Sequence, residues 1–274
     1  MTTEDRKWWI VRRVVVCAIV LAPPVTLIVW RASPLLALGI LFGTHLLLLV
    51  YPTLYFASQL FGPVVTRFET GKKEVWLTID DGPDPVDTPQ LLALLAHHGA
   101  RATFFVTGDR VRQHPETVRQ ILPAGQTLAN HSNSHPIESF WVLGPTRIAG
   151  EIDRCNEAIA QVTGQSPRWF RAPVGMKNPF VHPLLEARGM RLIGWSARGF
   201  DGVTNDTQSV VRRIMNRIQP GAIILVHEGR RDAEHHSISC ACVELLLTKL
   251  TEQGYSFVVP SDAALLAGRR NTNR

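Results

Sequence analysis

VWLTIDDGPDP, residues 75–85, carries an apolar strand into two adjacent carboxylates and a Gly-Pro turn. Side chains alternate along a strand, so Asp80 and Asp81 start on opposite faces, but the backbone curls where a strand ends and lets both approach one cavity. Adjacent like charges repel each other, so a positive side chain is expected close by. The alternative is an acidic turn in solvent, because Asp, Gly and Pro are the usual turn formers.

Strand-like and helix-like segments alternate along the chain from about residue 73 onwards. The expected strands are 75–80, 102–107, 126–131, 168–172, 190–195, 222–227 and 255–259. The expected helices include 88–97, 147–162, 207–218 and 241–252. Alternation at this spacing is typical of an α/β fold with parallel strands. We therefore expect a distorted (β/α) barrel of about seven parallel strands, with an open sheet as the alternative, and chemistry at the carboxyl ends of the strands.

The chain before this region is a predicted membrane anchor. Residues 14–30 and 35–50 and beyond contain no charged residue, and a short turn at 31–34 separates them. Apolar runs of about 17–25 residues can span a bilayer as helices. We expect two transmembrane helices, or a re-entrant hairpin broken at Pro23-Pro24; a cleaved signal peptide fits less well, because a clean cleavage site is missing and a second apolar run follows. The predicted division of the chain is 1–72 for the anchor, 73–265 for the soluble domain and 266–274 for a flexible basic tail.

Basic residues lie at the two outer ends of the pair of apolar runs, which a hairpin would place on the same side of a membrane. They are Arg6, Lys7, Arg12 and Arg13 before the first run and Arg67, Lys72 and Lys73 after the second. The turn between the runs offers only Arg31. Because basic flanks prefer the cytoplasm, we expect a multi-pass protein of the cell inner membrane with its soluble domain on the cytoplasmic side.

The composition of the chain restricts the classes of binding partner that are expected. The net charge is +6 with a pI near 9.5, and no Lys/Arg-rich block is interleaved with aromatic residues, so a membrane surface is favoured over nucleic acid. The four cysteines contain no C-x-x-C pair, so neither a disulfide framework nor a cysteine metal site is expected.

Polar residues follow the ends of several expected strands. His131 and His135 are four residues apart, and if one helical turn follows the strand, that spacing stacks both imidazoles on one face. Such a pair alone is also compatible with a solvated or packed surface. Together with a carboxylate from a neighbouring strand it makes a His₂-carboxylate set with open positions, which is the catalytic form of a zinc site. One aspartate of the opening stretch would then bind the cation and the other would take a proton from water.

Five ordered motifs resemble the signature of the NodB-type polysaccharide deacetylases, which are metal-dependent carbohydrate esterases. They are TIDDGP (78–83), HSNSH (131–135), RAPVG (171–175), RGFDG (198–202) and LVH (225–227), and the resemblance covers roughly residues 73 to 260. It implies Asp80 as general base and His227 as general acid, with a divalent metal held by Asp81, His131 and His135. It also implies that Arg171 steadies Asp80, that Asp201 orients Arg171 or His227, and that Leu225 lines a pocket for the acyl methyl.

The implied chemistry is hydrolysis of an N-acyl group, acetyl or formyl, from an amino sugar. A divalent ion, with zinc expected, polarises the amide carbonyl, and a backbone N–H near Val174 helps to stabilise the oxyanion. Asp80 accepts the proton of water, and His227, with an ordinary pKa of about 6.5, donates one to the amine. Ser132 and Ser196 have no base in a recognisable relay, so a serine hydrolase is not expected.

Two departures from the family pattern concern the substrate. Common members carry an aromatic residue in place of Val174 and an Asp-x-x-Asp-Trp stretch in place of residues 198–202. Arg198 puts a cation at the rim, which suits an anionic substrate. We therefore expect an amino sugar carried on a membrane lipid, such as an isoprenoid phosphate sugar or a glycolipid, at the cytoplasmic leaflet. The alternatives are a periplasmic peptidoglycan or chitooligosaccharide deacetylase and a catalytically silent, metal-binding anchor protein, although the intact Asp80 and His227 speak against the silent protein.

Overall fold

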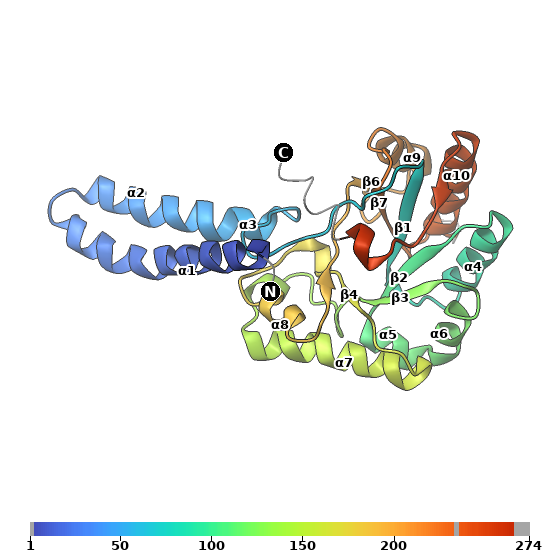
Figure 1. Ribbon diagram of the computed structural model, residues 1–274, viewed down its shortest axis with the longest axis horizontal. Helices are drawn as coiled ribbons and strands as arrows, with labels where there is room; N and C mark the ends of the chain where they lie inside the picture. Colours follow the sequence, from blue (N-terminus) through green and yellow to red (C-terminus); the bar gives the residue numbers. More distant parts are fainter. Residues whose placement is uncertain (1–2, 233–235, 266–274) are drawn as a thin grey trace.

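A helical hairpin precedes an α/β domain in the computed structural model, which describes residues 3–232 and 236–265 (Figure 1). The hairpin consists of α1 (Thr3–Trp30), α2 (Pro34–His45), the π-helix η1 (Leu46–Val50) and α3 (Tyr51–Leu54). Two stretches, Arg13–Trp30 and Pro34–Leu54, are long and apolar enough to cross a membrane, and few of their side chains are buried. The helix α1 runs through Pro23 and Pro24, so the hairpin turns after Trp30 and not at the proline pair.

In the described part of the chain, eight strands form one sheet, and all named strand pairs are parallel. They are β1 (Glu74–Gly82), β2 (Ala102–Val106), β3 (Thr127–Asn130), β4 (Trp169–Phe170), β5 (Arg191–Leu192), β6 (Ala197–Arg198), β7 (Ala222–His227) and β8 (Ser256–Phe257). The order is β5-β4-β3-β2-β1-β7-β6, and β8 pairs with β1 off this path. The predicted distorted barrel of parallel strands is confirmed, and the seven expected strands all occur in shorter or similar form.

Helices cover the convex face of the sheet. They are α4 (Asp87–His97), α5 (Gly108–Gln113), α6 (Pro115–Ile121), α7 (Pro145–Thr163), α8 (Val181–Glu186), α9 (Thr207–Met215) and α10 (Ile238–Glu252), with short 3-10 turns η2 (Phe140–Val142) and η3 (Pro173–Gly175). The four predicted helices correspond to α4, α7, α9 and α10. The predicted tail, 266–274, lies outside the described residues.

Alternation along β1 separates two cores. Val75, Leu77 and Ile79 belong to the cluster that packs under the helices. Trp76 belongs to the inner cluster with Phe105, Trp169 and Leu225, among others. Because side chains two residues apart share a face, Thr78 and Asp80 follow Trp76 on the inner side. The inner face therefore changes along the strand from aromatic packing to a polar end.

A seam segment, residues 64–68, joins the anchor to the sheet. Val65 forms a parallel bridge with Ile193, just after the edge strand β5, and Arg67 forms an antiparallel bridge with Ala222 at the start of β7. The Val65 N–H donates to Leu192 O at 3.0 Å, and Val65 O accepts from the Gly194 N–H at 2.8 Å. Val64, Val65 and Phe68 are buried in the inner and neighbouring clusters. Part of the stretch that the sequence pattern assigned to the anchor therefore packs as part of the soluble domain.

Candidate active site

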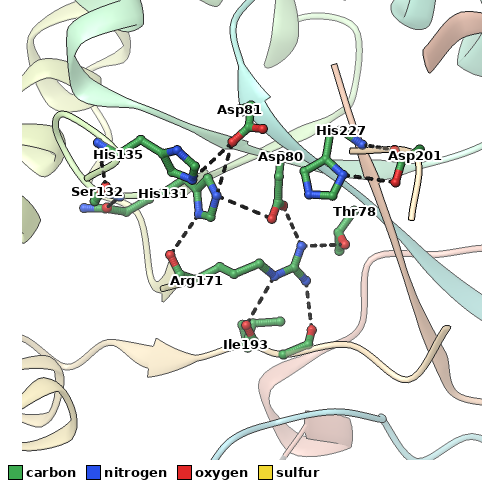
Figure 2. A network of polar contacts seen from close by, with 12 residues as sticks. Thr78, Asp80, Asp81, His131, Ser132, His135, Arg171, Ile193, Asp201 and His227 are labelled. Carbon is green, nitrogen blue, oxygen red and sulfur yellow. Dashed lines mark hydrogen bonds and ion pairs between the residues drawn. The ribbon is translucent and has the colours of Figure 1, made fainter. Parts of the chain in front are cut away.

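The polar residues at the strand ends converge at one mouth of the barrel (Figure 2). Asp80 and Asp81 come from the end of β1 and His227 from the end of β7. His131 follows β3, and Arg171 follows β4. Parallel strands place their carboxyl ends at the same edge, which explains why residues so far apart in the sequence meet there.

Asp80 forms a buried ion pair with Arg171. The Arg171 Nη1 donates to Asp80 Oδ1 at 2.6 Å, and both side chains are at most 2% exposed. The same nitrogen donates to Thr78 Oγ1 at 2.8 Å, while Nη2 and Nε donate to the backbone oxygens of Gly194 and Ile193. Burial lowers the pKa of Arg171, and Asp80 opposes this shift. The positive partner that the paired aspartates required is therefore Arg171, in a site where nearly every donor has an acceptor.

Asp81, His131 and His135 form a cluster suited to a metal ion. One ligand atom from each lies within 4.8 Å of the others. His131 Nε2 is 3.4 Å and His135 Nε2 is 3.3 Å from Asp81 Oδ1. Among the described residues, Asp81 Oδ1 and His135 Nε2 are buried without a hydrogen-bond partner. Buried polar atoms are normally paired, so these orphan atoms fit a site that takes a cation.

The left-handed backbone of Asp81 brings its side chain into this cluster. Asp81 has φ 72°, and the register of β1 against β2 shifts between Asp80 and Gly82. Strict alternation would have sent Asp81 to the convex face. The curl expected at the end of the strand is thus confirmed, and the neighbouring aspartates reach one cavity from different angles.

The protonation states of Asp81 and His135 favour metal binding by the cluster. Burial acts to raise the pKa of Asp81, but the closeness of His131 first, and then the charges of His227 and His135, outweigh it and hold this pKa far below its usual range. Burial, followed by the charge of His131, lowers the pKa of His135 to about 4. Both groups are therefore deprotonated near neutrality, as metal ligands must be. His131 Nδ1 lies 2.9 Å from Arg171 O and donates to it in the tautomer that leaves Nε2 free as a ligand.

The loop from His131 to His135 differs from the helical turn that the spacing suggested. It is irregular, with left-handed backbone at Ser132 (φ 67°) and His135 (φ 50°). Asn130 Oδ1 accepts from the Ser132 N–H at 2.7 Å, and Glu151 Oε2 accepts from the N–H groups of Asn133 and Ser134. The helical interpretation was wrong because side chains, not an i to i+4 ladder, satisfy the backbone donors here.

His227 and Asp201 form the opposite wall of the site. His227 Nδ1 lies 3.1 Å from Asp201 Oδ1, and the His227 N–H donates to Asp201 Oδ2 at 2.6 Å. Burial acts to lower the pKa of His227, but Asp201 first, and then Asp81 and Asp80, raise it to about 9. The imidazole is therefore protonated near neutrality. Of the two predicted contacts of Asp201, the structure shows the one with His227.

Known proteins are similar to this chain in sequence and in fold. The family model described as polysaccharide deacetylase matches residues 67–193. A chitooligosaccharide deacetylase from Bradyrhizobium sp. (strain ANU 289) is 32% identical over 193 residues, which cover 70% of this chain and 85% of that protein. This chain belongs to the polysaccharide deacetylase family. Family membership confirms the resemblance drawn from the motifs and makes the protein a hydrolase of amide bonds.

Two solved structures place this polysaccharide deacetylase among its relatives. The peptidoglycan deacetylase PdaC from Bacillus subtilis superimposes with a TM-score of 0.63 at 30% identity, covering 74% of this chain and 94% of that one. A CE4 family pseudoenzyme from Bacillus anthracis also gives a TM-score of 0.63 at 30% identity, covering 70% of this chain and 65% of that one. Because an active-looking fold thus occurs with and without activity, the side chains of the site carry the functional argument.

Strained backbone in this deacetylase is concentrated around the site. Among the described residues, the non-glycine residues with positive φ are Asp81, Ser132, His135, Val174 and Phe200. Asp81 is the penultimate residue of β1, and the other four lie in the loops after β3, β4 and β6. Such conformations cost on the order of 1–3 kcal/mol each and persist where the surroundings enforce them, typically at active sites. For Val174 the left-handed backbone is especially unfavourable, because its side chain is β-branched.

The predicted substrate residues have different environments in this deacetylase. Val174 is 43% exposed beside the mouth, whereas Leu225 is 2% exposed within the inner cluster. The guanidinium carbon of Arg198 lies 4.0 Å from the ring centroid of Phe200 and 5.5 Å from that of Trp195. Burial lowers the pKa of Arg198, and Asp201 opposes that shift. Arg198 is therefore a half-buried cation supported by aromatic faces, and the substrate roles of these residues stay predictions.

Two supporting residues of this deacetylase escaped the sequence analysis. Thr78 accepts a hydrogen bond from Arg171 and donates one to Ile224 O at 2.6 Å. Glu151 of α7 holds the loop that carries His131 and His135. Each left a signal, because Thr78 is a polar residue on the inner face of an apolar strand, and Glu151 neighbours Ile148 and Ile152 on the buried side of its helix.

Proposed function

We propose that this protein is a metal-dependent N-deacetylase of an amino-sugar glycan. The observation that carries the proposal is the meeting of three ligand atoms within 4.8 Å beside an ion-paired carboxylate and an imidazole with a raised pKa. The similarity to a chitooligosaccharide deacetylase and a peptidoglycan deacetylase favours N-acetylated glycans as the substrate class.

Asp81, His131 and His135 are the proposed metal ligands, with zinc as the expected ion. The orphan atoms of Asp81 and His135 and the deprotonated state of these two residues support this assignment. When bound, a divalent cation supplies Lewis acidity that polarises the amide carbonyl and makes water a better nucleophile at neutral pH. The Asp-His-His donor set suits zinc and leaves positions for substrate and water.

Asp80 is the proposed general base. Its Oδ1 is held by Arg171, and its Oδ2 lies 3.6 Å from His131 Nε2, so the carboxylate faces the cluster with a fixed orientation. This orientation places the carboxylate to accept the proton of the attacking water. The left-handed Val174 is the proposed source of a backbone N–H for the developing oxyanion.

His227 is the proposed general acid. It faces the cluster from the opposite wall, and Asp201 keeps it protonated and fixes its orientation. It can therefore deliver a proton to the nitrogen as the C–N bond breaks, which turns a poor leaving group into a neutral amine. The products are the free amino sugar and acetate, or formate if the acyl group is formyl.

A second candidate substrate is an amino sugar carried on a membrane lipid. The apolar hairpin and the half-buried cation of Arg198 favour it, while the similarity to chitooligosaccharide and peptidoglycan deacetylases favours a polymeric or oligomeric glycan. The basic flanks favour a cytoplasmic domain, which would suit the lipid-carried substrate, whereas peptidoglycan requires a domain outside the membrane. A carboxy-terminal reporter fusion that is active only in the periplasm would overturn the cytoplasmic topology.

The function is tested with the purified full-length protein in detergent. Acetylated chitooligosaccharide, peptidoglycan and lipid-linked N-acetylhexosamine are each incubated with it, and mass spectrometry follows the loss of the acyl group. We expect release from at least one substrate, abolished by a chelator and restored by zinc. Stoichiometric zinc binding without release from any of the three, or from an aryl acetate, would instead identify the silent metal-binding protein.

A further inference from the structure

The chain that leaves the second apolar helix is fixed to a loop of the active site. Lys177 is 2% exposed, and its Nζ donates to Tyr55 O at 3.0 Å and to Phe56 O at 2.8 Å. These are the first two residues after α3, which ends at Leu54. A buried amino group with two backbone acceptors holds this segment in one position. Tyr55 and Phe56 precede the residues that match the family model, 67–193, whereas Lys177 lies among those residues.

The same segment reaches the layer below the catalytic groups. The Phe56 ring stacks on Trp195 with centroids 4.3 Å apart and planes 10° apart. Trp195 in turn lies beside Arg171, whose guanidinium carbon is 5.7 Å from its ring centroid. A short series of contacts therefore runs from the end of the hairpin to the partner of Asp80, so the distance between the hairpin and the site is fixed by packing and not by a free linker.

Exposed apolar side chains surround this attachment point. The apolar rim consists of Ile137, Trp141, Val142, Val174 and Phe180, which are 51%, 39%, 59%, 43% and 41% exposed. They lie on the loops that follow β3 and β4. Asn178 ties the two loops together, because its Nδ2 donates to Trp141 O at 3.2 Å and to Leu143 O at 2.9 Å. The rim is thus one connected structure beside the mouth of the site.

The rim lies on the side from which the hairpin leaves the domain. In Figure 1, α8 and the start of α7 lie level with the base of the hairpin along the horizontal axis, whereas α4 and α10 lie at the far side. Phe180 immediately precedes α8, and Trp141 and Val142 come just before α7. If the hairpin spans a membrane, the surface of that membrane meets the domain at this side.

We infer that the apolar rim rests in the interfacial layer of the bilayer, so that the mouth of the active site opens at the membrane surface. This inference depends on the proposed membrane hairpin. Aromatic and aliphatic side chains with nearby backbone polar groups suit the headgroup region, where an indole can keep its N–H hydrated. The substrate class that fits is an amino sugar held at the membrane surface, with its acylated nitrogen within reach of the rim.

Site-directed fluorescence quenching in nanodiscs tests the inference without relying on activity. Cys17 and Cys240 are replaced by serine, and the buried Cys155 and Cys242 are kept. An environment-sensitive dye is then attached at Val142→Cys or Phe180→Cys. The matched control is Glu244→Cys on α10, an exposed position on the far side of the domain. The nanodiscs contain phosphatidylcholine and phosphatidylglycerol, with or without a phosphatidylcholine that is spin-labelled near the head of its acyl chain.

We expect severalfold stronger quenching by the spin-labelled lipid at the two rim positions than at Glu244→Cys, and weaker quenching there by aqueous iodide. Rim dyes that behave like the control would overturn the inference. Rim dyes that are shielded from iodide yet insensitive to the lipid quencher would also overturn it and would identify a second copy of the chain as the partner.

A paired activity measurement separates this inference from the proposed function. The double variant with Val142→Glu and Phe180→Glu places charges in the rim without changing a proposed catalytic group. We expect its turnover of soluble chitooligosaccharide to equal that of the parent protein, while turnover of vesicle-borne N-acetylhexosaminyl lipid falls about tenfold, the effect of a 1.4 kcal/mol change. An equal rate on the vesicle substrate contradicts the inference, whereas a parent protein that cleaves neither substrate contradicts the proposed function.

Discussion

The two halves of the strand end TIDDG differ in how their polar atoms are satisfied. In the base half, Asp80 is 2% exposed and is held by Arg171, which also reaches Thr78 and two backbone oxygens. In the ligand half, Asp81 is 32% exposed, and its Oδ1 lies 3.4 Å from His131 Nε2 and 3.3 Å from His135 Nε2, which are two further potential ligand atoms. Two identical side chains, adjacent in sequence, thus acquire different chemistry. The paired carboxylate is the proposed general base, and the unpaired one is a proposed metal ligand.

The largest effect is expected from breaking the ligand half. His131→Ala removes a proposed metal ligand that is also hydrogen-bonded to Arg171 O. We expect bound zinc, measured by inductively coupled plasma mass spectrometry, to fall to background and deacetylation to become undetectable. The control is His97→Ala, an exposed histidine at the end of α4, which should change neither quantity. Full zinc content in His131→Ala would contradict its role as a ligand.

Identical substitutions at the two aspartates sharpen the comparison. Asp80→Asn should keep stoichiometric zinc and lose about 10²- to 10⁴-fold in kcat, the usual contribution of a general base. Asp81→Asn should instead weaken zinc binding, so that added zinc restores part of its activity. Zinc titrations alongside kcat measurements distinguish the two variants. The division of roles fails if both variants show the same zinc affinity and the same kcat.

Stability provides a further test of the base half. Arg171→Met leaves the Asp80 carboxylate buried without its partner, and breaking one side of a buried pair typically costs about 3–5 kcal/mol in the free energy of unfolding. Arg168→Met is the matched control, because Arg168 is 78% exposed and pairs with Asp262 at 3.4 Å. A surface pair of this kind contributes only about 0–1 kcal/mol. Denaturant unfolding of the full chain in detergent, followed by tryptophan fluorescence, should separate the two variants. Similar losses in the free energy of unfolding would contradict the idea that buried Asp80 needs Arg171 as its partner.

The smallest expected effect is a shift in the pH profile of activity when Asp201, the partner of the proposed general acid His227, is replaced. The pKa of His227 is raised to about 9, with Asp201 as the chief favourable cause. A general acid works in its protonated form, so activity is present below this pKa and is lost as the pH rises through it. Asp201→Asn should move the alkaline limb of kcat/KM down towards the ordinary histidine pKa of about 6.5. An unchanged alkaline limb would assign that limb to another group.

Local patterns in the sequence were sufficient for the strands and for most of the site. The alternation in VWLTID and the carboxylates that follow it are short-range features, and five motifs at strand ends identified the residues that the structure brings together. β6 was missed because two residues, Ala197 and Arg198, show no periodicity. The helical turn after His131 was wrong because Glu151, which is distant in sequence, stabilises a different loop.

Long-range packing determines where the apolar anchor ends and the soluble domain begins, and the sequence pattern did not reveal this boundary. Nothing in the apolar run that ends near Val65 distinguishes residues that face lipid from residues that enter the soluble domain. The structure places Phe61, Val64, Val65 and Phe68 among buried side chains, through contacts with β5, β7 and α8 that are more than one hundred residues away. Hydropathy alone therefore extended the predicted anchor into the seam segment.

The seam segment bears on how a soluble version of the enzyme should be cut. A fragment that starts at Lys73 would lose the bridges to Ile193 and Ala222 and uncover the outer edge of β5, and free strand edges invite association between chains. A fragment that starts near Tyr55 would keep that edge covered, together with the Phe56 ring against Trp195. For crystallisation or screening, the useful boundary is therefore the last residue of α3 and not the last residue of the apolar stretch.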